Sequence, residues 1–251
     1  MVTSFVKTIV SALPDPVRRR LWIWQQQGPF RWPPVGQVKP HSLWRVRPIS
    51  RVYGMDRGFP VDRYYIEGFL AEHAQDIYGR VLEIADNKYT LKFGGSRVTQ
   101  SDVLHVEAGH SDVTIVADLT RGDELPSNAF DCIICTQTLP FIYEVHAAVK
   151  TLHRILKPGG VMLVTLPGIT KISSYDVGRW GHYWSFTALS TRRLLSDSFG
   201  AEAVEVASRG NVLTATAFLH GLASEELSKA ELEHNDLDYE VILTARVKKS
   251  K

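Results

Sequence analysis

The sequence predicts a doubly wound α/β fold: a Rossmann-like sheet of seven strands with an antiparallel last strand, preceded by a Trp- and Pro-rich extension. Beyond residue 51, short apolar runs alternate with stretches of helical periodicity. The run from Arg80 to Ala85 is apolar apart from Arg80 at its start and Glu83, which is typical of a parallel strand buried on both faces. The length of 251 residues fits one such domain plus an extension of about fifty residues.

The composition excludes several other classes of protein. Hydrophobic residues make up 44% and charged residues 22%, values that argue against disorder, collagen-like repeats and coiled coil. A membrane-spanning stretch and a signal-peptide pattern are both missing, so we expect a cytoplasmic protein. Cys132 and Cys135 form a CxxC inside an apolar run, which offers half of a zinc site without a second pair. We therefore expect reduced core thiols.

Residues 1–50 differ from residues 51–251 in charge and composition. They hold eight Lys or Arg against a single acid, whereas the remainder of the chain has a net charge of −5. They also contain seven of the twelve prolines and four of the six tryptophans. Residues 2–13 and 15–27 have helical patterns. We expect this extension to cover a thin face of the sheet and to dock on an anionic membrane or a partner enzyme.

The elements of residues 51–251 follow in order. Strands are predicted at 80–85, 97–103, 113–118, 130–136, 161–166, 202–208 and 239–247, and helices at 61–74, 144–156, 187–199 and 211–222. The last strand closely follows a helix and a polar loop, which favours an antiparallel strand near the sheet edge. The connections 85–97 and 102–113 are too short for ordinary crossover helices.

In a doubly wound sheet, ligands bind outside the carboxyl ends of the strands. Acidic or polar residues follow four of the predicted strands at this edge. They are Glu83, Asp102, Asp118 and the pair Thr136-Gln137. A further Leu156-Lys-Pro-Gly-Gly160 stretch closes a helix before the fifth strand.

This array resembles the class I S-adenosylmethionine-dependent methyltransferases, particularly bacterial domains of the type 11 kind, some of which accompany glycosyltransferases. The resemblance covers roughly residues 51–250. It implies that Glu83 lies beside the methionine part of the cofactor, that Asp102 accepts both ribose hydroxyls and that Asp118 accepts the adenine amino group. The cofactor contacts it implies are Glu83, Ala85, Asn87, Asp102, Val103, Asp118, Leu119, Thr136 and Gln137.

The turn after the first strand departs from the family pattern. Ala85, Asn87 and Tyr89 stand where the family has small residues, and Gly94 and Gly95 come late. Asn87 can replace a turn glycine if it adopts a left-handed backbone, whereas Tyr89 brings a ring close to the cofactor. Two interpretations remain, a variant cofactor pocket or a pocket that has lost its ligand. The presence of Asp102 and Asp118 favours the variant pocket.

The stretch from Gly168 to Thr187 is where this family builds its acceptor pocket. Methyl transfer is an in-line displacement that needs alignment and one proton acceptor, and His182 is the preferred base, with Asp176 and Tyr183 as alternatives. The expected substrate contacts are Tyr64, Tyr65, Arg179, Trp180, Tyr183 and Trp184. The aromatic residues can equally well pack the loop, and for residues 61–65 a helix start capped by Asp62 is the favoured alternative.

The leading hypothesis is an O-methyltransferase acting on a sugar or another small-molecule hydroxyl. The alternative is a non-catalytic methyltransferase-like domain that docks a glycosyltransferase or a membrane. A nicotinamide oxidoreductase requires a G-x-G-x-x-G turn that this chain lacks. A nucleic-acid substrate is disfavoured by the net negative charge of residues 51–251. No metal is expected, because His146 and His153 lack a third ligand.

Overall fold

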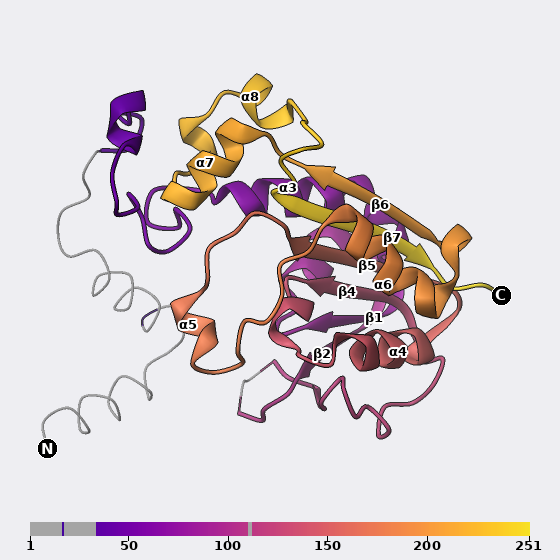
Figure 1. The fold of residues 1–251 in the computed structure, drawn as a ribbon. Coiled ribbons are helices and arrows are strands. Elements are labelled where there is room, and N and C mark those ends of the chain that lie inside the picture. Colours follow the sequence, from indigo (N-terminus) through magenta and orange to yellow (C-terminus); the bar gives the residue numbers. More distant parts are fainter. Residues whose placement is uncertain (1–16, 18–33, 110–111) are drawn as a thin grey trace, which may run out of the picture.

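The structure is a computed structural model that describes residues 17, 34–109 and 112–251. At its centre is a seven-stranded sheet with the strand order β3-β2-β1-β4-β5-β7-β6 (Figure 1). The strands are β1 (Gly79–Ile84), β2 (Val98–His105), β3 (Ile115–Val116), β4 (Phe130–Thr136), β5 (Leu156–Pro167), β6 (Val204–Arg209) and β7 (Ile242–Lys248). The first five pair in parallel, and β7 lies antiparallel between β5 and β6. The predicted fold class is confirmed.

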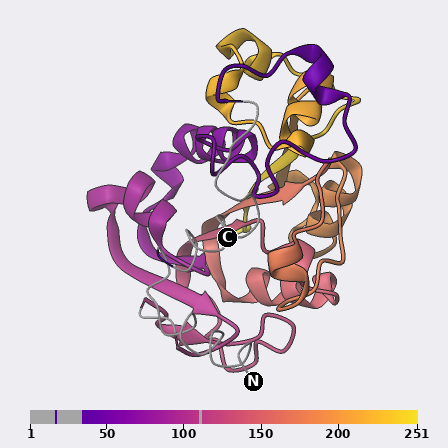
Figure 2. The ribbon, with the colours of Figure 1, turned by 90° about the vertical axis from the view of Figure 1, so that its left-hand side faces the viewer.

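Helices cover both faces of this sheet. They are α3 (Val61–Glu72), α4 (Val145–Ile155), α5 (Ser174–Val177), α6 (Ala188–Phe199), α7 (Val212–His220) and α8 (Lys229–Glu233). Figures 1 and 2 show α4 and α6 on one face and α3 and α7 on the other. Among the described residues, no helix is both long and apolar enough to cross a membrane.

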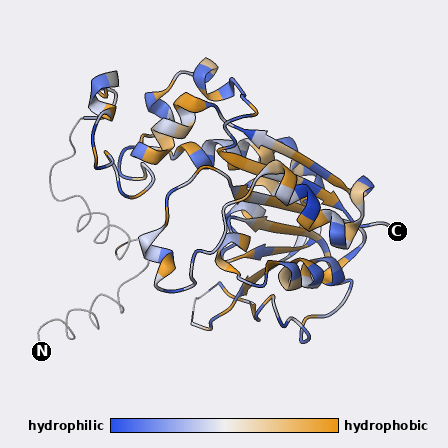
Figure 3. Cartoon of the chain, in the orientation of Figure 1, coloured by the Kyte–Doolittle hydropathy of each residue, from blue (hydrophilic) through white to orange (hydrophobic). Residues whose placement is uncertain are grey.

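The continuous apolar strands are explained by burial on both faces. On β1, Leu82 belongs to the core under α4 and α6, while the preceding Val81 belongs to the core under α3 and α7. On β4, Ile133 belongs to the core under α4 and α6, and Ile134 belongs to the core under α3 and α7. Successive strand residues point to opposite faces, so a strand covered twice must be apolar at nearly every position. Figure 3 shows this as hydrophobic colour along the central strands.

Local capping sets two helix boundaries that the sequence predicts to within two residues. Helix α6 begins at a capping box in which the side-chain oxygens of Thr187 and Ser190 each accept a hydrogen bond from the other's backbone N–H. Helix α7 begins at Asn211, whose side chain accepts from the backbone of Leu213 and Thr214. It ends at Gly221, which is left-handed with a φ of 72°.

Both short connections are confirmed. A π-helical turn (Thr90–Gly94) and a 3-10 turn (Gly95–Arg97) join β1 to β2 in place of a longer helix. Between β2 and β3, the described residues contain no helix. The region Leu156–Gly160 differs from the prediction, because it already belongs to β5 and is not a turn before it. Cys132 and Cys135 are buried free thiols.

The described part of the extension packs against α7 and the residues that follow it. The backbone N–H groups of Ile49 and Ser50 both donate to the carbonyl of His220 at 2.9 Å. Trp44 is 93% exposed, so this tryptophan is not buried against the domain. The helices predicted at 2–13 and 15–27, and their packing on the sheet, lie outside the described residues apart from Val17.

A buried ion pair holds residues 50–58 to the segment after α7. The Arg57 guanidinium donates from Nε to Glu226 Oε1 at 2.7 Å and from Nη2 to Glu226 Oε2 at 2.6 Å. The two side chains are only 1% and 2% exposed. Burial acts to raise the pKa of Glu226, but the hydrogen bonds from Arg57 and from the backbone of Ala223 and Gly36 hold that pKa below its usual value. This bidentate pair therefore fixes the start of the domain.

We expect Glu226→Gln to lower the free energy of unfolding by about 3 kcal/mol, because it leaves the Arg57 charge buried without a counter-charge. Urea denaturation measures the change. The matched control is Glu233→Gln, which breaks the exposed pair with Lys229 at 3.4 Å and is expected to cost less than about 0.5 kcal/mol. Equal losses in the two variants would contradict this role.

Candidate functional site at the carboxyl edge of the sheet

Four segments meet at the carboxyl edge of the parallel strands. They are the turn after β1, the ends of β2 and β3, the residues after β4, and the loop 168–187 after β5, which carries α5 (Figures 1 and 2). The start of α3 and residues 50–58 reach the same region, since Tyr53 and Arg63 contact the loop after β5 and the turn after β1. This is the edge where the sequence predicts a ligand.

Glu83 organises the turn after β1. Its side chain is buried, and its carboxylate accepts hydrogen bonds from the backbone N–H of Tyr89 (3.2 Å) and from the backbone N–H and hydroxyl of Thr90 (both 2.7 Å). Burial raises the pKa of Glu83 to about 7, although these hydrogen bonds act to lower it. A titratable carboxyl group near neutrality at a sheet edge is typical of a functional site.

The backbone of this turn keeps the glycine-like geometry at its first position. Ala85 has a φ of 78°, and its N–H donates to the carbonyl of Leu104 at 2.9 Å. Holding a non-glycine residue there costs on the order of 1 kcal/mol. Asn87 is not among the residues with positive φ, so the expectation that it replaces a glycine through a left-handed backbone is wrong.

The Tyr89 hydroxyl is held by Arg63, a residue that the sequence analysis did not assign to the site. The Arg63 guanidinium on α3 donates from Nη1 to the Tyr89 hydroxyl at 2.8 Å. The Tyr89 ring lies against Phe93, with centroids 6.1 Å apart. A cation in the first turn of a helix opposes the helix dipole, and that signal could have identified Arg63 as a residue with a specific partner.

Asp102 lies inside β2 and not at its end. Strand β2 continues for three more residues, and Asp102 pairs in register with Leu82. Its carboxylate accepts from Arg80 Nε at 2.7 Å and from the Thr114 hydroxyl at 3.2 Å, and it is nearly buried. These partners correct the expectation that Asp102 is free to accept the ribose. The acidic residue exposed past the strand end is Glu107.

Asp118 lies at the edge as expected. It is exposed, and its Oδ1 accepts from the backbone N–H and the hydroxyl of Thr120, both at 2.8 Å. Val103 and Leu119 are buried in the core, so their side chains support this edge from behind.

Gln137 follows Thr136, the last residue of β4, at the same edge. Gln137 has a φ of 50°, its backbone N–H donates to Thr165 O at 2.9 Å, and its side chain donates to the Thr165 hydroxyl. A strained non-glycine backbone at the mouth of a site is typical of functional positions. Thr136 is half-buried beside it.

His182 is packed into the loop after β5. Its Nδ1 faces the backbone N–H of Ser173 at 3.5 Å, and its ring meets Phe141 edge-on, with centroids 5.3 Å apart. Its Nε2 is buried and has no hydrogen-bond partner in the described part of the chain. Burial lowers the pKa of His182, so the ring is neutral at pH 7. Asp176 lies nearby and accepts a hydrogen bond from the Ser173 hydroxyl.

The predicted substrate contacts divide into separate groups. Tyr183 and Trp184 lie together, whereas Trp180 packs against His105 at the end of β2 at 5.3 Å. The guanidinium of Arg179 stacks on Tyr175 at 3.9 Å.

The structure does not bring Tyr65 to the site. Its side chain is buried and donates to the Leu232 carbonyl at 2.8 Å, which corrects the expectation that it contacts the substrate. Its neighbour Tyr64 is half-buried and packs edge-on against it.

Tyr53 and Lys171 form a pair at this edge that the sequence analysis missed. The Lys171 ammonium lies 3.7 Å from the centre of the Tyr53 ring, and the Tyr53 hydroxyl donates to the Lys171 carbonyl at 3.3 Å. Burial lowers the pKa of Lys171 to about 8 and raises that of Tyr53 to about 12. Tyr53 has a φ of 60°, so strained backbone accompanies this contact too.

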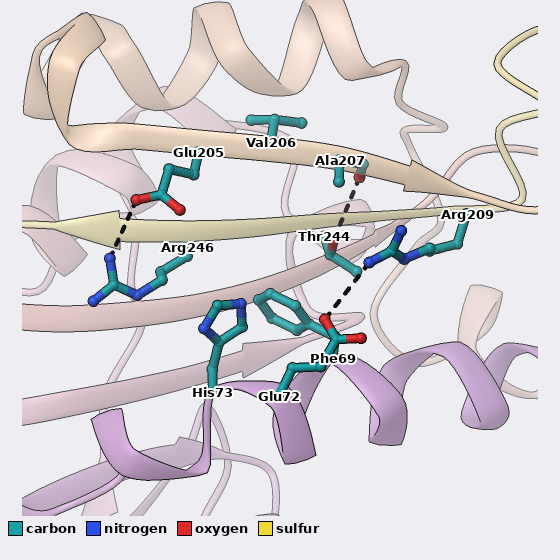
Figure 4. Close-up of a pocket in the computed structure, with 9 residues that line it drawn as sticks. All are labelled: Phe69, Glu72, His73, Glu205, Val206, Ala207, Arg209, Thr244 and Arg246. Carbon is teal, nitrogen blue, oxygen red and sulfur yellow. Dashed lines mark hydrogen bonds and ion pairs between the residues drawn. The ribbon is translucent and has the colours of Figure 1, made fainter. Parts of the chain in front are cut away.

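A separate pocket lies on the α3 side of the sheet, at the β6 edge (Figure 4). Its charged residues pair with each other: Glu72 with Arg209 at 3.6 Å, and Glu205 with Arg246 at 3.3 Å. No predicted site residue lines it. Its ion pairs join α3 to β6 and β7, which gives them a structural role. Across residues 34–109 and 112–251, no group of three His, Cys, Asp or Glu side chains is placed to hold a metal ion.

Residues 66–164 match a family model described as a methyltransferase domain. This stretch runs from α3 through the turn after β1 and past β4 into β5, so it contains most of the edge described above. This part of the chain is therefore similar to a methyltransferase domain. No curated protein matches the sequence significantly.

Several solved structures of low sequence identity are similar to this chain. One is an S-adenosylmethionine-dependent methyltransferase from Archaeoglobus fulgidus, with 12% identity, a TM-score of 0.50, and coverage of 74% of this chain and 94% of that chain. Another is the N-methyltransferase NodS from Bradyrhizobium japonicum WM9, in complex with S-adenosyl-L-homocysteine, with 17% identity, a TM-score of 0.47, and coverage of 77% and 89%. The [4+2]-cyclase SpnF has 20% identity, a TM-score of 0.49, and coverage of 75% and 81%.

The Glu83 carboxyl group predicts a pH dependence of stability. Its pKa is about 7 in the folded domain against 4.5 for the free group, so between these pH values the folded protein holds a proton that the unfolded chain has lost. The free energy of unfolding of the wild type should therefore fall relative to Glu83→Gln as pH rises from 4.5 to 7, by up to about 1.4 kcal/mol per pH unit. Urea denaturation at pH 5, 6, 7 and 8 measures this difference. The exposed Glu202→Gln serves as control, and a pH-independent difference for Glu83→Gln would contradict the assignment.

Proposed function

We propose that this protein is an S-adenosylmethionine-dependent methyltransferase that methylates a hydroxyl group of a sugar or another small molecule. The observation that carries the proposal is the buried Glu83 carboxylate, which organises a left-handed turn at Ala85 beside a row of acidic and amide side chains. The matched family model and the shared fold support the same reaction class. The bound cofactor would supply an electrophilic methyl group on a sulfonium.

The residues at the edge have the chemistry that such a cofactor requires. Glu83 offers a carboxylate toward an ammonium group, and Gln137 offers an amide at the mouth of the site. Asp118 keeps its Oδ2 without a partner in the described residues, which suits the amino group of adenine. Because Asp102 is committed to Arg80 and Thr114, we assign the ribose hydroxyls to Glu107. The half-buried Asn87 and Thr136 complete the expected contacts.

His182 is proposed as the base that takes the acceptor proton. Its lowered pKa keeps the imidazole neutral and able to accept a proton at pH 7. In the proposed step, the O–H bond of the acceptor breaks and its proton moves to the imidazole. The acceptor oxygen forms a bond to the methyl carbon, and the carbon–sulfur bond breaks with its electron pair on sulfur. Asp176 and Ser173 hold the loop that positions the ring.

Cofactor binding is expected to depend on the acids at the strand ends. Replacement of Glu107 or Asp118 by Ala should weaken the binding of S-adenosyl-L-homocysteine at least about tenfold, because each loses a hydrogen bond to a charged group. Titration calorimetry measures this directly. Asp102→Ala should instead lower the melting temperature, since it leaves Arg80 without its partner. If Asp102→Ala keeps its stability and loses binding while Glu107→Ala binds normally, the ribose assignment returns to Asp102.

Methyl transfer is expected to depend on His182. Turnover is measured with radiolabelled cofactor and a panel of methyl glycosides as acceptors. His182→Ala should reduce it about 10²- to 10⁴-fold while leaving the binding of S-adenosyl-L-homocysteine unchanged. Wild-type kcat/KM should fall as pH drops below the lowered pKa of this ring, because the protonated imidazole cannot accept a proton. If His182→Ala turns over at the wild-type rate, the role of the base passes to Asp176 or Tyr183.

The substituted turn favours a second candidate, a methyltransferase-like domain that docks a glycosyltransferase or a membrane without catalysis. Tyr89 stands where the family has a small residue, and its ring takes up space at this edge. Calorimetry with the cofactor and its demethylated product separates the two candidates, since only the enzyme binds them. The docking role itself is tested by liposome co-sedimentation of the full chain and of a chain without residues 1–27.

A further inference from the structure

Three exposed aromatic rings form a surface that we call the aromatic platform: Tyr143, Tyr183 and Trp184. Their exposed fractions are 62%, 51% and 37%. Tyr143 stacks on Trp184, with centroids 5.9 Å apart and an interplanar angle of 24°, and meets Tyr183 edge-on at 5.4 Å. Clustered exposed aromatic residues commonly mark a ligand surface.

The platform is held rigidly by two segments. The indole N–H of Trp184 donates to the carbonyl of Ile142 at 3.0 Å, and the backbone N–H of Tyr183 donates to the carbonyl of Pro140 at 2.8 Å. Gly181 has a φ of 86°, and a Cβ there would lie 2.4 Å from the Tyr183 ring. The chain thus keeps a glycine where the ring needs room, and a surface fixed in advance loses little entropy on binding.

The platform adjoins the proposed site of methyl transfer. Tyr143 lies in the segment after β4 that begins with Gln137, and Tyr183 and Trp184 lie in the loop after β5. His182 directly precedes Tyr183 and packs on Phe141, which belongs to the same post-β4 segment. The platform and the proposed base are therefore carried by the same two segments, the one after β4 and the loop after β5.

We propose that the aromatic platform is the acceptor subsite and that its ligand is a pyranose ring. One face of a pyranose is a set of C–H groups, which carry partial positive charge and complement the negative faces of aromatic rings. The hydroxyl groups of the sugar lie around its rim, where the tyrosine hydroxyls are available. The proposal rests on the proposed function, because it identifies the molecule that the methyl group would reach.

A protein partner fits this surface less well. Stable protein interfaces bury about 800 Å² on each side around a closed apolar centre. Three rings cover far less area than that, and the exposed polar residues Glu144 and Ser185 flank them directly. A sugar ring matches both the size and the polar surroundings of the platform.

The test is binding of methyl β-D-glucopyranoside, methyl α-D-mannopyranoside and methyl β-D-galactopyranoside to the full chain saturated with S-adenosyl-L-homocysteine. Saturation-transfer NMR and tryptophan fluorescence measure it. We expect millimolar binding of at least one glycoside, weakened at least fivefold in Tyr143→Ala and in Gly181→Ala. Tyr78→Ala is the matched control, because Tyr78 is 42% exposed but precedes β1, away from the carboxyl edge. Tyr143→Ala is the decisive variant, since within residues 34–109 and 112–251 no hydrogen bond of its side chain holds the loop.

The outcomes separate this inference from the proposed function. The platform is not a sugar subsite if the wild type binds S-adenosyl-L-homocysteine but no glycoside, or if Tyr143→Ala binds glycosides as tightly as the wild type. The methyltransferase proposal stands in both cases. Binding of tetramethylammonium in place of every glycoside also overturns the inference. If the wild type does not bind S-adenosyl-L-homocysteine, the proposed function itself fails. Glycoside binding lost in Tyr143→Ala, with an unchanged melting temperature and unchanged cofactor binding, supports it.

Discussion

The buried carboxylate of Glu83 is the interaction on which the carboxyl edge depends. It accepts three hydrogen bonds that close the turn from β1 to Thr90, in which larger residues stand at the family's glycine positions. With the turn closed, Ala85 is held in a left-handed conformation and Tyr89 is directed toward Arg63 on α3. The position of α3 is therefore coupled to the cofactor side of the edge by a hydrogen bond and not only by apolar packing.

The acceptor side is built by a different principle. The loop after β5 has few buried apolar residues, and its order comes from local polar contacts and from aromatic rings packed across to the segment after β4. Ser173 and Asp176 close a short turn, while Trp184 and Tyr183 bond to backbone carbonyls of residues 140–142. This arrangement leaves His182 packed inside and the platform outside, so one loop supplies a buried ring and an exposed surface.

Most of the strained backbone lies where these parts meet. Of the four non-glycine residues with positive φ in the described part of the chain, Tyr53, Ala85 and Gln137 lie at or next to the carboxyl edge, whereas Asn128 precedes β4. The surrounding hydrogen bonds offset the cost, which amounts to about 1–3 kcal/mol at each position. Such strain is consistent with selection for geometry at this edge and not for stability alone.

The sequence by itself determined the fold class, because hydrophobic periodicity is a local property: the apolar runs of β1 and β4 and the capped starts of α6 and α7 can be recognised without any partner. It also placed the right segments at one edge, since the carboxyl ends of parallel strands must meet. Only the tertiary structure decided which side chains are free there. Asp102 and Tyr65 look available in the sequence, but the register of β2 places Asp102 against Arg80, and the packing of α3 turns Tyr65 toward Leu232. Arg63, Lys171 and Tyr143 gain their roles from contacts with residues distant in sequence, and such contacts leave no periodic signal in the chain.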